Sequence, residues 1–240
     1  MKRIFLVDAD DTLLDFHGSA QKGLRVAFAK CGLVWQEEYA KRFKEINDKL
    51  WESLERKELT RATLMRERFP LFLAALGLDS SIGETFNRHY LEYLANNPLY
   101  IEGAEEFLAR LKTHGEVYIV TNGTEWIQKL RFTKSGLFEK ANDVFISDAI
   151  GADKPAKAYT DYVVAHIENF DVSQAVWIGD SLSADIKAAN EAGITSIWFN
   201  PNGKTGGGAA KPDYEAKNFD EILKILQGTA FPEKKNCSNV

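Results

Sequence analysis

Residues 5–16 read FLVDADDTLLDF and place three carboxylates directly after a run of apolar residues. The apolar run has the length and composition of a parallel strand covered on both faces, although so few residues also suit a buried helix turn. In an extended chain, Asp8 and Asp10 point to the same side. Converging carboxylates repel each other and need a cation, a shared proton or water. The alternative is an acidic loop in which Asp11 or Thr12 caps the next helix.

The composition is typical of a globular protein with one large domain, or a core with a smaller insertion. The chain has 240 residues, of which 45% are hydrophobic and 27% are charged, enough for a sizeable core. A net charge of −5 argues against a nucleic-acid binder with a broad basic surface. No apolar run approaches a membrane span, and the N-terminal one is too short for a signal peptide. We therefore expect a cytoplasmic location.

The two cysteines, Cys31 and Cys237, lie far apart and outside any CxxC or Cys/His cluster. This pattern indicates neither a disulfide framework nor a zinc site. We interpret Cys237 as an unmodified thiol, because polar residues follow it where prenylation requires aliphatic ones. Residues 228–240 are expected to form a disordered tail.

Short β-rich runs alternate with helical stretches in the second half of the chain. They lie at 116–120, 143–147, 175–178 and 195–199. This alternation predicts a parallel sheet wound with helices. The glycine-rich stretch at 200–211 lacks the context and register of a P-loop, so we expect a flexible connection there.

A segment of roughly 80 residues separates the first β-rich run from the others, and its apolar spacing predicts about three to five amphipathic helices. The candidate helices are 19–31, 35–56, 60–76 and 81–96. Pro70 is expected to kink or split the third. The predicted architecture is α/β: a Rossmann-like, doubly wound parallel-sheet core of residues 1–15 and 99–227, with an inserted α-helical cap at 16–98.

Polar residues capable of chemistry follow four of the β-rich runs, at the sheet edge where α/β proteins bind ligands. They are Asp8-Ala9-Asp10-Asp11-Thr12, Thr121-Asn122-Gly123, Asp153-Lys154-Pro155, and Gly179-Asp180-Ser181 with Asp185. Together they supply a possible nucleophile, a hydroxyl donor, a lysine and further carboxylates.

The order DxDxT, Thr after the second strand, Lys-Pro and GDSxxxD resembles the haloacid dehalogenase superfamily, with the helical insertion placed as in its C1-type caps. Within that superfamily DADDTL, INDKLW, Arg68-Phe69, VTNG and GDSLSADI are most similar to the nucleotidases that hydrolyse nucleoside 5′-monophosphates. The resemblance implies Mg²⁺ and a small phosphorylated metabolite. Neither a nucleic-acid polymer nor a membrane is expected as a partner, and the protein is expected to be a monomer or a small homo-oligomer.

Asp8 is the candidate nucleophile, since attack on phosphorus would give an aspartyl phosphate and split one difficult step into two. Asp10 would protonate the leaving alkoxide and then accept a proton from the attacking water. Asp8 and Asp180 suit Mg²⁺, which prefers hard oxygen ligands, and the resemblance adds the Asp10 carbonyl. Asp11 stands where many superfamily members carry Gly and is expected to serve the turn or cap a helix, with Thr12 as a turn stabiliser.

The remaining motif residues are expected to bind the phosphoryl group. The Thr121 hydroxyl and the backbone N–H groups of Asn122 and Gly123 would donate hydrogen bonds to its oxygens, and Lys154 would supply positive charge. Taken alone, Thr121 could equally cap a helix and Lys154 could lie on the surface.

Two further residues, Ser181 and Asp185, are interpreted as supporting the site. Asp185 would orient either the metal ligands or Lys154, and its alternative role is that of an acid in the first turn of a helix.

The resemblance to the nucleotidases makes Asn47, Trp51 and Arg68 of the helical insertion candidates for substrate recognition. The alternatives are that Trp51 belongs to the core and that Arg68 is a solvated charge.

The sequence thus predicts a Mg²⁺-dependent phosphatase, a phosphoric monoester hydrolase acting on pyrimidine nucleoside 5′-monophosphates. Alternatives are a phosphatase of sugar phosphates or phosphoglycolate, a phosphomutase, and a 2-haloacid dehalogenase. Asp10 disfavours the dehalogenase, because the family resemblance places a non-acidic residue there. Two further alternatives are not enzymes. A phosphate-accepting receiver module is disfavoured, because receivers are about half this length. A metal-binding scaffold without turnover would share the motifs and stays open.

Overall fold

The structure, a computed structural model, describes residues 2–206 and 210–228 and divides into two compact units. The α/β unit contains the residues up to Asp15 and those from Leu99 onward, and the helical unit is Phe16–Pro98. Residues 229–240, which include Cys237 and all but the first residue of the expected tail, lie outside the described residues.

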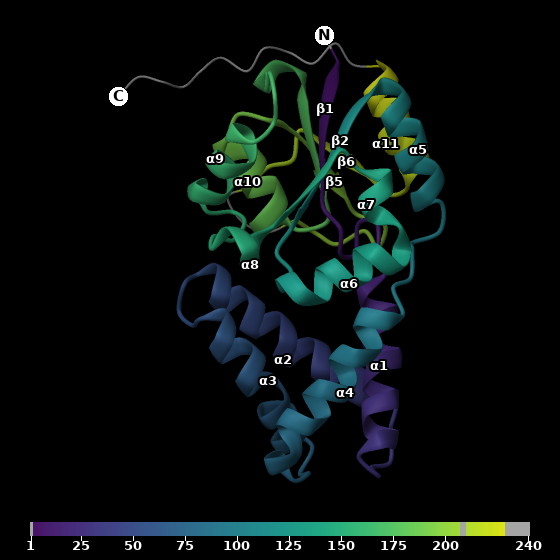
Figure 1. Cartoon of the computed structure of the whole chain (residues 1–240), viewed down its shortest axis with the longest axis vertical. Coiled ribbons are helices and arrows are strands. Elements are labelled where there is room, and N and C mark those ends of the chain that lie inside the picture. Colours follow the sequence, from purple (N-terminus) through teal and green to yellow (C-terminus); the bar gives the residue numbers. More distant parts are fainter. Residues whose placement is uncertain (1, 207–209, 229–240) are drawn as a thin grey trace. The chain divides into compact units, whose positions relative to one another are not determined.

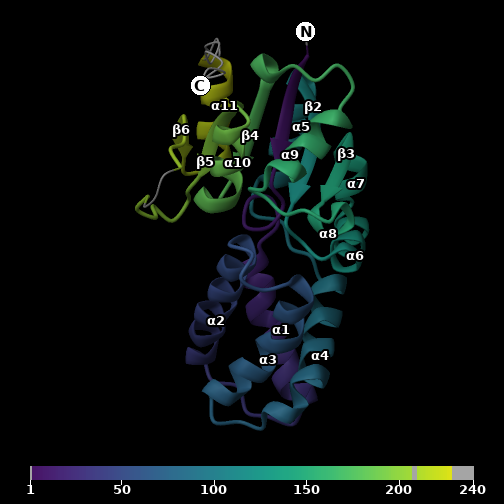
Figure 2. The same cartoon turned by 90° about the vertical axis from the view of Figure 1, so that its left-hand side faces the viewer.

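A six-stranded parallel sheet forms the centre of the α/β unit. Figure 2 shows its order, β3-β2-β1-β4-β5-β6, from right to left. The strands are β1 (Arg3–Val7), β2 (Gly115–Thr121), β3 (Asp143–Ile146), β4 (Ala175–Gly179), β5 (Thr195–Phe199) and β6 (Tyr214–Ala216). The predicted α/β sheet is therefore confirmed, and β6 is an addition that was not predicted.

The strand register brings the ends of three strands together. Val7 at the end of β1 is paired with Ile119 of β2 on one side and Ile178 of β4 on the other. The residues that follow these positions therefore meet at the same edge of the sheet.

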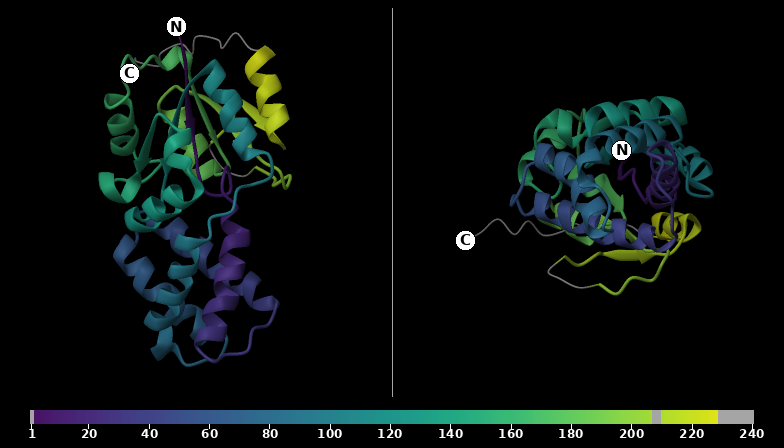
Figure 3. Two further views of the ribbon diagram at one scale, coloured as in Figure 1. Left: turned by 45° about the vertical axis from the view of Figure 1, so that its right-hand side comes forward. Right: turned by 90° about the horizontal axis from the view of Figure 1, so that it is seen from below.

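Helices cover both faces of the sheet (Figure 1). Alternate residues of β1 point to opposite faces, so Phe5 joins a core with α5 and α11, and Leu6 joins one with α9 and α10. Figure 3 shows α5 and α11 side by side. The bounds are α5 (Ala104–His114), α6 (Glu125–Ser135), α7 (Leu137–Lys140), α8 (Ser147–Ile150), α9 (Lys157–Ala165), η2 (Val172–Gln174), η3 (Leu182–Ile186), α10 (Lys187–Glu191) and α11 (Phe219–Gly228).

The helical unit is built around a cluster of aromatic rings. Its elements are α1 (Phe16–Lys30), α2 (Glu38–Glu55), α3 (Arg61–Ala75), η1 (Ser80–Ile82) and α4 (Gly83–Asn96). The ring of Phe69 lies 5.0 Å from both Phe86 and Tyr90 and 5.4 Å from Phe43, measured between centroids. Aromatic pairs at such distances add to the stability gained from burying their surface.

Helix α3 continues through Pro70, so the chain is not split at this residue, and the other expectation, a kink, stays a prediction. A proline removes one helical hydrogen bond, but Phe69, Phe72 and Leu73 next to it are fully buried. Their burial favours the continuous helix. At its start, the Thr60 side chain accepts a hydrogen bond from the Thr63 N–H at 3.2 Å and caps the helix.

The glycine-rich stretch at 200–211 begins with a closed turn. The Asn200 side chain donates to the Lys204 carbonyl at 2.9 Å and accepts from the Lys204 N–H at 2.8 Å. Residues 207–209 lie outside the described residues, and the flexible connection stays a prediction. Over the described ranges 2–206 and 210–228, no helix combines the length and apolar character needed to cross a membrane.

Candidate active site

Asp8 follows β1 directly, and its carboxylate meets a buried lysine. Lys154 Nζ donates to Asp8 Oδ1 at 2.6 Å, to Asp185 Oδ1 at 2.7 Å and to the Val120 carbonyl at 2.8 Å. The exposed fractions are 6% for Asp8, 2% for Lys154 and 1% for Asp185. Lys154 is therefore not a surface residue, and its charge is held within the cluster.

One ammonium group does not neutralise the carboxylates around it. Oxygens of Asp8, Asp180 and Asp185 lie within 4.8 Å of one another. When all are ionised, these three carboxylates exceed the two ammonium groups that pair with them, Lys154 and Lys204, and leave a formal charge of −1. Burial raises the pKa of Asp8 well above its usual value; Lys154 opposes the rise, and Asp185 and Asp180 add to it. Burial also opposes the charge on Lys154, but the carboxylates of Asp185 and Asp8 outweigh it and raise the pKa of the lysine.

This donor set fits Mg²⁺, which prefers hard oxygen ligands and would balance the excess negative charge. Asp8 and Asp180 are the residues that could bind the ion directly. Burial raises the pKa of Asp180 to about 6, Asp11 adds to the rise, and Lys204 opposes it. Lys204 Nζ lies 3.2 Å from Asp180 Oδ2. The role of the Asp10 carbonyl as a ligand stays a prediction.

Asp185 is held by hydrogen bonds to both carboxylate oxygens. Trp177 Nε1 donates to Oδ1 at 3.3 Å, and the Ser181 N–H donates to Oδ2 at 3.2 Å. Gly179 makes room for this side chain, because a Cβ at that position would lie 2.3 Å from Asp185 Cγ. These contacts orient Asp185 toward Lys154, which is one of the two supporting roles expected for it.

Two neighbouring side chains fix the backbone of the site. Ser181 Oγ accepts from the Ala184 N–H at 3.1 Å and caps η3. Asn122 pairs with the backbone of Lys154: its Nδ2 donates to the carbonyl at 2.9 Å and its Oδ1 accepts from the N–H at 2.8 Å. The Asn122 side chain thus positions Lys154, while its predicted backbone contact with phosphate stays a prediction.

The Asp10 carboxylate is bound by helix α6 and not by the acidic cluster. Its Oδ1 lies 2.6 Å from Arg131 Nη1, and its Oδ2 accepts from Gln128 Nε2 at 2.8 Å. The same Nε2 lies 2.9 Å from Thr121 Oγ1. The two carboxylates of the first motif, Asp8 and Asp10, therefore have different surroundings.

Gln128 and Arg131 were missed by the sequence analysis. They have exposed fractions of 1% and 2% and are the polar members of the buried face of α6, beside Ile127 and Phe132. In the sequence, these two polar residues fall at helical spacing on an otherwise apolar helix face. That pattern could have indicated that they are buried.

Asp11 serves the turn that follows β1. It has φ of 59°, in the left-handed region, and its N–H donates to the Leu14 carbonyl at 2.7 Å. Glycine adopts this conformation without strain, and aspartate is among the few other residues that tolerate it. The buried Thr12 hydroxyl has no hydrogen-bond partner among the described residues, and the role of Thr12 as a turn stabiliser stays a prediction.

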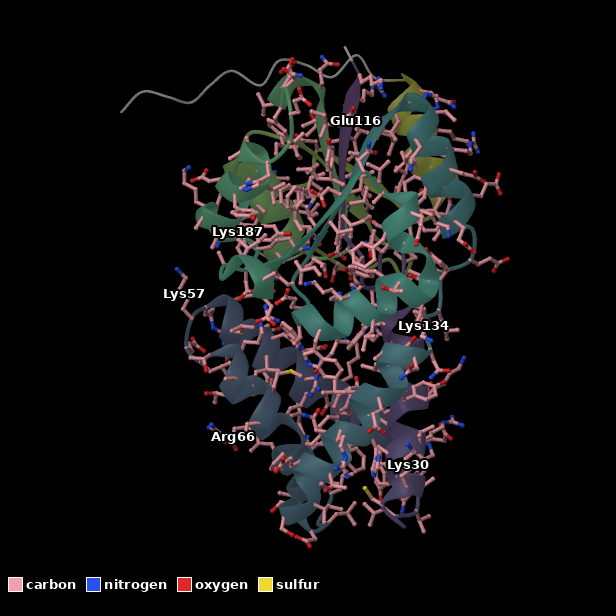
Figure 4. The ribbon with its side chains drawn as sticks, in the orientation of Figure 1. Lys30, Lys57, Arg66, Glu116, Lys134 and Lys187 are labelled. Carbon is pink, nitrogen blue, oxygen red and sulfur yellow. The ribbon has the colours of Figure 1, made fainter. Side chains whose placement is uncertain are left out.

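In the helical unit, the structure brings Asn47 and Arg68 together. Arg68 has 3% of its surface exposed, and its guanidinium donates to Asn47 Oδ1 at 3.3 Å and to Asn87 Oδ1 at 3.2 Å. Burial lowers the pKa of Arg68. Arg68 is therefore not a solvated surface charge, which was the alternative to a role in recognition. Arg66 of the same helix is exposed and points away from the unit in Figure 4.

Trp51 is not part of the contact between Asn47 and Arg68. It is half-buried, and the guanidinium of Arg61 lies 5.3 Å from the centre of its ring. Its role in recognition stays a prediction.

A sequence model of the haloacid dehalogenase-like hydrolases matches residues 2–193, and the chain belongs to this family of hydrolases. It is 34% identical to the HAD-hydrolase YfnB of Bacillus subtilis over 93% of this chain and 95% of YfnB. A crystal structure of YfnB bound to magnesium matches with a TM-score of 0.87, covering 94% and 98% of the two chains.

Two curated relatives are named as pyrimidine 5′-nucleotidases. PynA of Streptococcus pneumoniae is 32% identical, with 93% of this chain and 94% of PynA covered. YjjG of Escherichia coli is 24% identical, with 91% and 95% covered. These findings confirm the resemblance to the superfamily that the motifs indicate.

Proposed function

We propose that the protein is a Mg²⁺-dependent phosphatase that hydrolyses small phosphate monoesters through an aspartyl phosphate. The observation that carries the proposal is the different environment of two carboxylates in one motif. Asp8 is buried beside Lys154, whereas Asp10 is held separately by Gln128 and Arg131. Carboxylates in different environments can take different roles, here nucleophile and acid/base.

In the first step, an Asp8 oxygen attacks phosphorus, the phosphorus–alkoxide bond breaks, and Asp10 transfers its proton to the leaving oxygen. In the second step, Asp10 takes a proton from water as the water oxygen attacks phosphorus and releases Asp8. Lys154 and the Thr121 hydroxyl stabilise charge on the phosphoryl oxygens. When bound by Asp8 and Asp180, Mg²⁺ supplies further electrostatic stabilisation of that charge.

For the substrate, we propose pyrimidine nucleoside 5′-monophosphates. Support comes from the names of PynA and YjjG, which match over nearly the whole chain. The helical unit is proposed to act as a cap that carries recognition residues. In this unit, Arg68 is a buried cation that is neutralised by no carboxylate among the described residues, and it binds Asn47 through a neutral oxygen. Its Nε has no hydrogen-bond partner among the described residues and is proposed to donate to a carbonyl oxygen of the base.

A phosphate-release screen tests both levels of the proposal. Pyrimidine and purine nucleoside 5′-monophosphates, sugar phosphates and phosphoglycolate are compared with Mg²⁺ and with a chelator. We expect Mg²⁺-dependent release of one phosphate per substrate consumed, with the highest kcat/KM for pyrimidine nucleotides. A clear preference for sugar phosphates would reject the nucleotidase but retain the phosphatase. Substrate conversion without phosphate release would indicate a mutase, and no conversion of any ester would reject the phosphatase.

The cytoplasmic location and the monomeric or small homo-oligomeric state also stay predictions. Size-exclusion chromatography with light scattering measures the oligomeric state, and a mass far above that of a small oligomer would contradict it.

A further inference from the structure

The side chain of Gln128 connects two residues of the proposed mechanism. Its Nε2 donates to Asp10 Oδ2 at 2.8 Å and to Thr121 Oγ1 at 2.9 Å. Arg131 completes the arrangement, because its Nη1 donates to Gln128 Oε1 at 2.7 Å and lies 2.6 Å from Asp10 Oδ1. Asp10, Gln128 and Arg131 therefore form a closed ring of contacts to which Thr121 is joined.

Helix α6 and the Thr-Asn-Gly motif both shape this arrangement. Gln128 and Arg131 are three residues apart and so lie on one face of α6, with 1% and 2% of their surfaces exposed. Gly123 leaves the space that Gln128 occupies, because a Cβ there would lie 2.2 Å from Gln128 Cγ and 2.4 Å from Nε2. Hydrogen bonds within a buried network hold the side chains that make them in defined positions.

The direction of the hydrogen bonds suits catalysis. A hydroxyl carries one donor and two acceptor positions. Because Thr121 accepts from Gln128, its own proton remains available for a phosphoryl oxygen. Asp10 accepts a hydrogen bond at Oδ2 and forms an ion pair with Arg131 at Oδ1, and these two contacts keep the group from rotating away from the leaving oxygen.

We propose that Gln128 and Arg131 are positioning residues that hold Asp10 and Thr121 in one fixed arrangement, so that leaving-group protonation and phosphoryl binding occur in the same geometry. This proposal rests on the proposed function, because it takes Asp10 as the acid. Neither residue touches the substrate; each acts through Asp10 or Thr121.

The dependence of the rate on the leaving group provides the test. An acid matters most when the leaving group is a poor one, such as the alkoxide of a nucleoside, and least for p-nitrophenolate. Gln128→Met keeps the length of the side chain and removes its N–H. The second step is the same for both substrates, so kcat/KM, which reports attack by Asp8 and release of the alcohol, is compared. We expect kcat/KM for a nucleoside 5′-monophosphate to fall about 10²-fold, with less than about a tenfold fall for p-nitrophenyl phosphate.

A second variant guards against a failure of Gln128→Met to fold. Arg131→Lys keeps the charge but loses the planar guanidinium whose Nη1 contacts both Asp10 and Gln128, so we expect the same selectivity for poor leaving groups with about a tenfold loss. Lys129→Met is the matched control on the same helix, since Lys129 is exposed and pairs with Glu125. Its kcat/KM should equal that of the unaltered protein for both substrates.

Asp10→Asn separates the failure of the inference from that of the proposed function. If Asp10→Asn itself lowers kcat/KM equally for both substrates, the assignment of Asp10 as the acid is wrong. If Asp10→Asn is selective but Gln128→Met and Arg131→Lys slow both substrates equally, with lower melting temperatures, the two residues are only structural and the inference is overturned. Non-additivity supports it: adding Gln128→Met to Asp10→Asn should lower kcat/KM for the nucleotide by less than about tenfold, because only the contact with Thr121 is then left to lose.

Discussion

Lys154 in the α/β unit and Arg68 in the helical unit are both buried cations, with 2% and 3% of their surfaces exposed. Lys154 lies within 2.7 Å of two carboxylates, those of Asp8 and Asp185. Arg68 contacts amide oxygens, and the centroid of the Phe69 ring lies 4.9 Å from its guanidinium carbon. The neighbouring carboxylates raise the pKa of Lys154, whereas burial lowers that of Arg68.

The difference separates two uses of a buried charge. Loss of Lys154 would leave two buried carboxylates without a cation, which lowers the stability of the fold. Loss of Arg68 would leave no buried carboxylate among the described residues without a partner. Lys154 should therefore matter for the stability of the fold as well as for activity. Arg68 should matter mainly for what the protein binds.

Removing one carboxylate from the Lys154 cluster should have the largest effect. Asp8→Asn takes away the proposed nucleophile, and we expect kcat to fall by about 10⁴-fold or more. Mg²⁺ binding, measured by calorimetry, should be largely retained because the amide keeps one oxygen ligand. Unchanged turnover in this variant would refute the covalent mechanism.

Removing the cation of the same cluster should affect folding. Lys154→Met leaves Asp8 and Asp185 without their partner, and we expect the free energy of unfolding to fall by about 3–5 kcal/mol. Denaturant titration of the metal-free protein gives the value. Lys157→Met is the control, because Lys157 is exposed and pairs only with exposed Asp161 among the described residues, so its effect should stay within about 0.5 kcal/mol. Equal effects of the two variants would contradict the importance of charge pairing at Lys154.

The corresponding change in the helical unit should affect binding more than folding. Arg68→Met leaves no described carboxylate without its cation, but it removes the donor of two amide oxygens. We therefore expect the free energy of unfolding to fall by about 1–2 kcal/mol. If Arg68 recognises the substrate, KM for the nucleotide should rise about tenfold, which is the size of a hydrogen bond to a charged group. Arg66→Met, on the exposed side of the same helix, should change neither quantity. An unaltered KM in Arg68→Met would end its assignment to recognition.

The smallest expected effect is a pH dependence of Mg²⁺ binding. Burial raises the pKa of Asp180 to about 6, so below that pH the free protein carries a proton that the metal must displace. The dissociation constant for Mg²⁺ should therefore be steady at neutral pH and rise about tenfold per unit as the pH falls below about 6. Because Lys204 opposes this pKa shift, Lys204→Met should move the onset to higher pH. A constant affinity down to pH 5 would contradict the role of Asp180.

Much of the α/β unit could be predicted because its signals are local. The apolar run before Asp8 becomes β1, and the Thr121, Lys154 and Asp180 motifs follow neighbouring strands as expected. Strand β6 was missed because it has only three residues and a mixed burial pattern. The continuity of α3 at Pro70 depends on burial of the flanking side chains, which its sequence does not display.

The contacts of Asp10 could not be predicted, because they are distant in sequence. Gln128 lies 118 positions from Asp10, and only the folded sheet brings α6 to the end of β1. Arg68 posed the same difficulty, since Arg66 has the same charge and lies on the same helix but remains exposed. Which arginine is buried depends on helix packing and not on residue type.

The position of β1 between β2 and β4 also has a consequence for how the chain folds during synthesis. Its partner strands end at Thr121 and Gly179, so more than two-thirds of the chain must be made before the Asp8 and Asp180 carboxylates can meet. The helical unit, Phe16–Pro98, is continuous in sequence and can form its contacts earlier. The carboxylates of the nascent protein are thus brought together only once the sheet is complete through β4.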